Sequence, residues 1–182
     1  RRFIATEWIA SPDAVPAGAI RHAVEDSREG WAKAMEHLES LAFEGARGRT
    51  LVLDFSAIRP RGAPIGGMQG RPASGPLSLM RAFANLRHHV IEPARHGGLP
   101  RWEQALLADH HLSVEVQVGG ARRAARMATK SWRDPGIHRF IRAKSEGGLW
   151  TANNSVMVDA AFWSAVQDQA DPDHARARSV FE

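Results

Sequence analysis

The chain has 182 residues, of which 43% are hydrophobic and 24% charged, as expected for a globular protein large enough to bury a core. It contains no cysteine, which excludes disulfides and thiolate metal sites, and its net charge of +4 is too small to indicate a nucleic-acid partner by itself. No apolar run approaches the ~18 residues of a membrane-spanning helix, and the N-terminal residues do not resemble a signal peptide. We therefore expect a cytoplasmic protein.

Arginine dominates the basic residues, since only three of the 24 are lysines. Arginine keeps its charge and forms bidentate bonds to phosphate, so this bias suits a phosphate-rich ligand. A GC-rich coding sequence would produce the same bias, and both interpretations stay open.

The first half of the chain predicts a helix, a strand and a long loop, after an irregular lead-in over residues 1–20. Asp26 is predicted to cap the helix, with Glu29 as its capping-box partner, and apolar residues then recur at helical spacing up to Ala42. Residues 51–55 predict a buried strand, and a glycine- and proline-rich loop follows between Pro60 and Pro76.

The second half predicts further helices and strands in alternation. In chain order these are a helix over 79–90 that stops near Pro93 or Gly97–Gly98, a helix from Pro100 to Val116, an extended stretch over 122–129, a short helix after Asp134–Pro135, a strand over 155–158, a helix capped by Asp159, and a fraying tail from Asp171. Strands separated by helices predict an α/β fold. We expect one partial domain over 1–182, with 21–170 as its main segment and 171–182 as a tail, and both ends look cut rather than capped.

Two segments have residue types suited to nucleotide binding. The loop contains five glycines between Gly62 and Gly75, which would let a ligand approach the main chain, and Gln69 and Arg71 could contact a base or a phosphate. On physical grounds alone, a plain connection is the more common use of such a loop. Asp26 could bond a ribose hydroxyl, or it could serve only as a helix cap.

Several stretches, in order, resemble the adenosylcobalamin-dependent (class II) ribonucleotide reductases. They are Asp-Ser-Arg-Glu-Gly-Trp at 26–31, the loop at 61–76 that ends in Ser-Gly-Pro, Gly-Gly-Ala-Arg-Arg within 118–127 followed by 131–144, and Thr-Ala-Asn-Asn-Ser at 151–155. The resemblance extends from Val24 to Trp163. It departs from the family's pattern in a loop tip that is one residue longer, and at Gly136, which replaces an acidic residue.

This resemblance implies a segment of the family's α/β barrel, from an enzyme that uses adenosylcobalamin and a cysteine thiyl radical to reduce ribonucleotides to deoxyribonucleotides. The radical and redox cysteines are absent here, so we expect this chain alone to be inactive and to contain no catalytic or metal-binding residue. A second hypothesis is a non-catalytic module on the same scaffold that binds nucleotides or nucleic acid.

The resemblance also implies roles for particular residues. A deoxynucleotide (dNTP) effector would bind at Asp26, Ser27, Arg47, Arg49 and Arg59. A specificity loop between effector and substrate would include Gly66, Gly67, Met68, Gln69, Gly70, Arg71, Ser74 and Gly75. Structural residues, or residues near the substrate channel, would be Arg122, Arg123, Asn153, Asn154 and Ser155.

Two further hypotheses concern surfaces. The helix over Asp26–Phe43 is a candidate homodimer contact. The histidine pairs 88–89 and 110–111 are expected at the surface or at an interface. Adjacent histidines point to different faces of a helix, so neither pair is a ready metal clamp.

Overall fold

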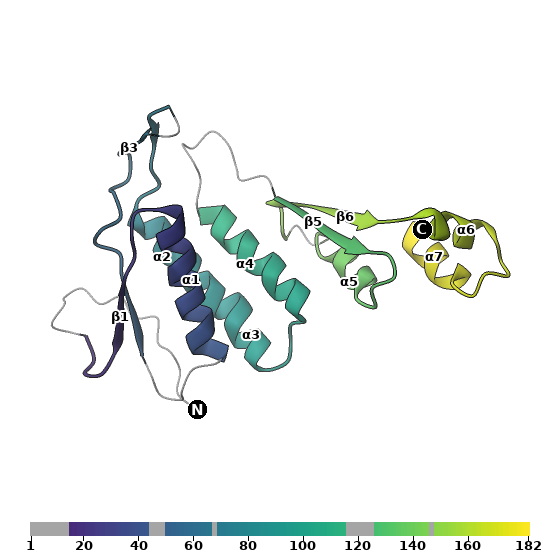
Figure 1. Cartoon of the computed structure of the whole chain (residues 1–182), viewed down its shortest axis with the longest axis horizontal. Coiled ribbons are helices and arrows are strands. Elements are labelled where there is room, and N and C mark those ends of the chain that lie inside the picture. Colours follow the sequence, from purple (N-terminus) through teal and green to yellow (C-terminus); the bar gives the residue numbers. More distant parts are fainter. Residues whose placement is uncertain (1–14, 44–49, 67–68, 116–125, 146–147) are drawn as a thin grey trace. The chain divides into compact units, whose positions relative to one another are not determined.

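The computed structural model describes residues 15–43, 50–66, 69–115, 126–145 and 148–182 (Figure 1). The chain divides into two compact units, Arg1–Arg123 and Ala124–Glu182. Each unit combines helices with small sheets, which confirms mixed α/β structure at this coarse level. Within the described ranges no helix is both long and apolar enough to cross a membrane.

The first unit contains two short sheets and a group of helices. Its elements are β1 (Ile20–Ala23), α1 (Arg28–Phe43), β2 (Leu51–Asp54), β3 (Pro64–Ile65), β4 (Arg71–Pro72), α2 (Pro76–Leu86), the π-helix η3 (Arg87–Ile91), α3 (Glu92–Arg95) and α4 (Arg101–Glu115). Strands β1 and β2 pair in parallel, from Ile20 opposite Leu51 to Ala23 opposite Asp54. The sequence predicted β2 but not β1, whose four residues are too few to show a clear alternation.

Helices α1, α2 and α4 share one hydrophobic core, and Figure 1 shows them side by side. From α1 the core receives Ala34, Leu38 and Ala42, which recur every four residues along one face of the helix. Leu79 and Phe83 of α2 and Ala108 of α4 complete the contact. This core fixes α1 in place, and with it the residues that precede α1.

The start of α1 corrects the predicted cap. The helix begins at Arg28, and the Ser27 hydroxyl accepts a bond from the Gly30 backbone N–H at 2.9 Å. Ser27 is therefore the cap, and the prediction of Asp26 was wrong by one residue. The predicted capping box with Glu29 is also wrong, because the third helical position, where the box needs an acid, is Gly30.

The second predicted helix continues past Pro93 and ends at the glycine pair. Between α2 and α3 the backbone bonding widens to the i→i−5 pattern of the π-helix η3, in which the Glu92 N–H bonds the Arg87 carbonyl. Pro93 then falls in the first turn of α3, where proline is tolerated. The Gly97 N–H then bonds the Ala94 carbonyl and the Gly98 N–H bonds the Pro93 carbonyl, with Gly97 at φ 74°. These bonds form a Schellman ending, so the glycine pair is the stop that the sequence predicted as one of two alternatives.

The second unit contains β5 (Arg126–Ser131), α5 (Ile137–Arg142), β6 (Ala152–Met157), α6 (Ala160–Gln167) and α7 (His174–Phe181). Strands β5 and β6 pair in parallel, from Arg126 opposite Ala152 to Ser131 opposite Met157. The predicted cap of α6 is confirmed, because the Asp159 carboxylate accepts a bond from the Phe162 N–H at 2.9 Å.

The predicted fraying of the tail from Asp171 is wrong. Residues His174–Phe181 form α7, and Ala177 is fully buried against a core that contains Trp132, Phe162 and Ala165. The polar composition of the tail concealed a short apolar face that α6 covers.

Candidate functional site

The predicted effector residues Asp26 and Ser27 lie in the turn between β1 and α1. Gly30 makes this turn possible, because a Cβ at that position would lie 2.6 Å from Glu25 Cβ and 2.7 Å from the Glu25 carbonyl oxygen. Ser27 is occupied by its capping bond to Gly30. Because Ser27 and not Asp26 caps the helix, the Asp26 carboxylate is available for other contacts.

Arg59 contacts that carboxylate. Its Nε donates to Asp26 Oδ2 at 2.5 Å, and the two side chains remain 34% and 26% exposed, respectively. The same guanidinium donates through Nη1 to the Pro64 carbonyl oxygen at 3.1 Å. The structure thus brings together two predicted effector residues and adds Pro64, which the sequence did not indicate.

The glycine-rich loop is a β-hairpin. Strands β3 and β4 pair antiparallel, with Pro64 opposite Pro72 and Ile65 opposite Arg71. At the base the Gly62 N–H bonds the Ala73 carbonyl at 2.9 Å, and the Ala73 N–H bonds the Ala63 carbonyl at 2.8 Å. The predicted loop is therefore a structured element and not an irregular connection.

The hairpin tip contains Gln69, one of the two residues predicted to contact a base or a phosphate. Gln69 is exposed and has φ 58°, a left-handed conformation that costs free energy for residues other than glycine. Gly70 follows at φ 74°, and its N–H bonds the Ile65 carbonyl at 3.2 Å. Arg71 is exposed on β4. Gly66 is also exposed, whereas Gly67 and Met68 lie outside the described residues.

Gly75 joins the hairpin to α2. It has φ 79°, and a Cβ there would lie 2.8 Å from the Arg61 backbone nitrogen, so only glycine fits without strain. Pro76 then starts α2 at a position where its missing N–H costs nothing. Ser74 is partly buried beside this junction. The two ends of the hairpin are thereby held close together.

Of the other predicted residues, four arginines lie outside the described residues: Arg47, Arg49, Arg122 and Arg123. Asn153, Asn154 and Ser155 lie on β6 in the second unit. Asn153 is exposed, whereas the Asn154 side-chain N–H donates to the Phe140 carbonyl of α5 at 3.3 Å. That bond fits a structural role for Asn154.

The first unit also contains a histidine contact that the sequence did not predict. His111 of α4 stacks on His89 of η3, with ring centroids 5.1 Å apart. Burial, with a smaller effect of His89 and His110, lowers the pKa of His111 to about 4. His88 and His89 are exposed, as the sequence predicted, whereas His110 and His111 are partly buried. Among the described residues no group of histidine, cysteine, aspartate or glutamate is arranged to hold a metal ion.

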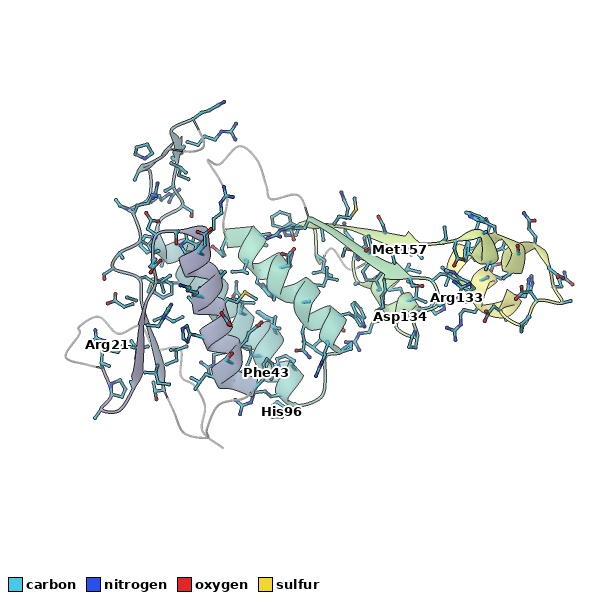
Figure 2. All side chains as sticks on the ribbon, in the orientation of Figure 1. Arg21, Phe43, His96, Arg133, Asp134 and Met157 are labelled. Carbon is cyan, nitrogen blue, oxygen red and sulfur yellow. The ribbon has the colours of Figure 1, made fainter. Side chains whose placement is uncertain are left out.

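In the second unit, charged and aromatic groups gather where β5 ends, near the labelled Arg133 and Asp134 in Figure 2. Arg133 lies over the Trp132 ring at 4.2 Å and donates to Asp159 at 2.5 Å. This bond, with that from the Phe162 N–H, lowers the pKa of Asp159. Because Asp159 also accepts from the Trp132 ring N–H, this cluster has a structural role at the start of α6.

Known proteins share sequence with this chain over most of its length. Residues 4–90 match the family model described as "B12-dependent ribonucleotide reductase, insertion domain". A putative adenosylcobalamin-dependent ribonucleoside-triphosphate reductase of Mycobacterium phage D29 is 35% identical over 85% of this chain and 24% of its own length. Adenosylcobalamin-dependent ribonucleoside-triphosphate reductases of Lactobacillus delbrueckii subsp. bulgaricus and of Lactobacillus leichmannii are each 34% identical over 80% of this chain and 20% of their own lengths.

The chain thus spans about a fifth to a quarter of the length of these relatives. The match covers both the turn at Asp26 and the hairpin that Arg59 contacts. With identity extending over most of its length, the chain belongs to the family of adenosylcobalamin-dependent ribonucleotide reductases.

Proposed function

We propose that this chain carries the dNTP effector site and the specificity loop of a ribonucleotide reductase that depends on adenosylcobalamin. The observation that carries the proposal is the contact of Arg59 with both Asp26 and the hairpin. An effector site that controls substrate choice needs two parts in contact: a group that binds the nucleotide, and a segment that moves and contacts the substrate base. Arg59 joins the candidates for these parts, Asp26 and the hairpin.

Within this site Asp26 would accept a ribose hydroxyl of the effector, since an ionised carboxylate has several acceptor positions. The effector phosphates would bind arginines, for which Arg47, Arg49 and Arg59 remain the candidates. Arg59 already donates to Asp26 and Pro64, but a guanidinium has five N–H donors, so these two bonds do not exhaust it. Exposed Gln69 and Arg71 would read the substrate base from the hairpin.

The hollow beside α1 does not fit adenosylcobalamin. This hollow of about 400 Å³ is lined by one helix, through Ala32, Met35, Glu36, Glu39, Ser40 and Phe43 of α1. Side chains from a single helix do not enclose a large cofactor. We therefore assign the cofactor, and the radical chemistry it supplies, to other parts of the full-length protein. The two parallel strand pairs are compatible with a piece of the proposed barrel.

The relatives are named as ribonucleoside-triphosphate reductases, and we propose triphosphates as the substrates of the full-length protein, in a cytoplasmic setting. The chain itself has no cysteine and so cannot form a thiyl radical. Incubated with a ribonucleoside triphosphate, adenosylcobalamin and a dithiol, it should give no deoxynucleotide. Turnover above background would contradict the assignment of the chemistry to other residues.

The effector site is tested by Asp26→Ala in the full-length reductase. A charge-assisted hydrogen bond contributes ~1.5–3 kcal/mol, so dNTP affinity measured by calorimetry should fall about tenfold to a hundredfold. Asp54→Ala is the matched control, because Asp54 is also partly buried and its carboxylate accepts a bond from the Ser56 backbone N–H. If Asp26→Ala binds effector as tightly as the control, the carboxylate is not part of the site.

The outer side of α1 is proposed as a homodimer contact. It carries the hollow described above, and Phe43 is 47% exposed at its end. Phe43→Glu should shift the full-length protein from dimer to monomer in light scattering, since a charge at an apolar contact is costly. A wild-type protein that is monomeric at all concentrations would exclude the contact.

A further inference from the structure

Arg59 is the side chain through which the two parts of the proposed site meet. Its Nε bonds Asp26 Oδ2 at 2.5 Å, across 33 positions of sequence, while its Nη1 bonds the Pro64 carbonyl at 3.1 Å. A guanidinium is planar and rigid, so a displacement at one of these donors also moves the other.

Both partners of Arg59 are attached to ordered structure. Asp26 precedes the capped first turn of α1, whose backbone packs against Glu25 through Gly30. Pro64 begins β3, at the base of the hairpin. Arg59 itself follows Ile58, which is 6% exposed and belongs to the first unit's core. Its backbone is thus anchored, and the guanidinium is the part that can move.

We propose that Arg59 is the positioning residue that transmits effector occupancy from Asp26 to the hairpin. This inference rests on the proposed function, because it assumes that the effector binds at Asp26. A ribose hydroxyl that donates to Asp26 shares the carboxylate with Arg59 and shifts the guanidinium. The bond from Nη1 to Pro64 then changes, and the hairpin takes a different position. Such a difference between effector states is what coupling requires.

Two substitutions separate charge from geometry. Arg59→Met keeps a stem of similar length but removes both donors. Arg59→Lys keeps a positive charge beside Asp26 but lacks the planar fork that reaches Asp26 and Pro64 together. If the fork is the link, lysine should support effector binding without restoring communication.

The experiment uses the full-length reductase with two competing ribonucleotides. We compare the ratio of their products with and without saturating dNTP, and measure dNTP affinity by calorimetry. In Arg59→Met and Arg59→Lys the effector-induced change in this ratio should fall by about fivefold or more, on the scale of typical allosteric coupling. Arg81→Met, a substitution of an exposed arginine on α2, should keep the wild-type response.

Hydrogen exchange gives a second readout that does not depend on turnover. The Gly62 and Ala73 amides bond across the hairpin base, so effector should alter their exchange in the wild type. In Arg59→Met that response should be lost, while amides of the α1 core remain protected. A variant that merely unfolds would lose protection in both regions.

The outcomes distinguish this inference from the proposed function. If Asp26→Ala binds dNTP normally, the effector site itself is wrong, and the inference fails with it. If Asp26→Ala loses binding while Arg59→Met keeps the full effector response, the site stands and Arg59 is not the link. If Arg59→Lys responds like the wild type, charge alone is sufficient and the bond to Pro64 is not the route.

Discussion

Acid should destabilise the first unit through His111. The ring stacks on His89 at 5.1 Å, and its Nε2 is buried without a hydrogen-bond partner among the described residues. A proton on this ring would therefore lie in a poorly solvated place beside two other histidines. Burial is the main cause that lowers the pKa of His111 from 6.5 to about 4.

The sign and size of the effect follow from that difference. Between pH 6.5 and 4 the unfolded chain binds a proton at His111 that the folded chain does not, so stability is complete above pH 6.5 and falls as the pH falls. A pKa about 2.5 units lower in the folded state corresponds to at most ~3.4 kcal/mol, at ~1.36 kcal/mol per unit. Because the ring is partly exposed, solvent screening reduces this to about 1–2 kcal/mol.

The assay is urea unfolding of the chain at pH 7.5 and pH 4.5, for the wild type and for His111→Phe. Phenylalanine keeps the aromatic contact with His89 but does not titrate, so the variant should lose about 1–2 kcal/mol less than the wild type on acidification. Burial also lowers the pKa values of His22 and His110, so part of the pH dependence should remain. His96→Phe, at an exposed position, is the control. If wild type and His111→Phe lose equal stability, His111 is not the group responsible.

Three further predictions concern the hairpin and the second unit. Gly75→Ala should destabilise the chain by ~1–3 kcal/mol in urea unfolding, because of the positive φ and the clash with Arg61, whereas Gly66→Ala, which meets no atom within 4 Å, should be nearly neutral. Ala177→Asp would bury an unpaired carboxylate and should lower the melting temperature of the second unit sharply. In the full-length reductase, Gln69→Ala should flatten the effector-dependent substrate ratio without weakening effector binding. Unchanged ratios would leave Gln69 with no role as a reader.

Local sequence patterns predicted those elements that are long enough for their apolar spacing to repeat, or that have a local cap. The four-residue period of α1 and the cap of α6 at Asp159 followed from sequence, because both depend on neighbours within one or two turns. The short strand β1 did not follow, since its pairing with β2 is a long-range contact. The helix α7 was missed for a related reason. Its apolar face is only recognisable once α6 is there to cover it.

The contacts within the candidate site could be predicted from the sequence even less well than the elements. Asp26 and Ser27 are both good helix caps, and the sequence alone could not decide between them. The structure assigns the cap to Ser27 and gives the Asp26 carboxylate to Arg59. The sequence named Arg59 as a candidate effector residue but gave no sign of its bond to Asp26. The contact with Pro64 could not be predicted either, because every residue has a backbone carbonyl and the residue type does not show which one accepts a bond.

These two hidden contacts change how the arginine-rich composition is understood. An arginine that only bound phosphate would lose effector affinity and little else when replaced. If our proposal holds, replacing an arginine that bonds both the Asp26 carboxylate and the hairpin should first remove communication between effector and substrate choice. The arginine-rich composition favours a role in phosphate binding, whereas the bonds to Asp26 and Pro64 favour a role in communication. Because the two differ in which quantity changes, affinity or substrate ratio, the Arg59 variants decide between them even if both show reduced turnover.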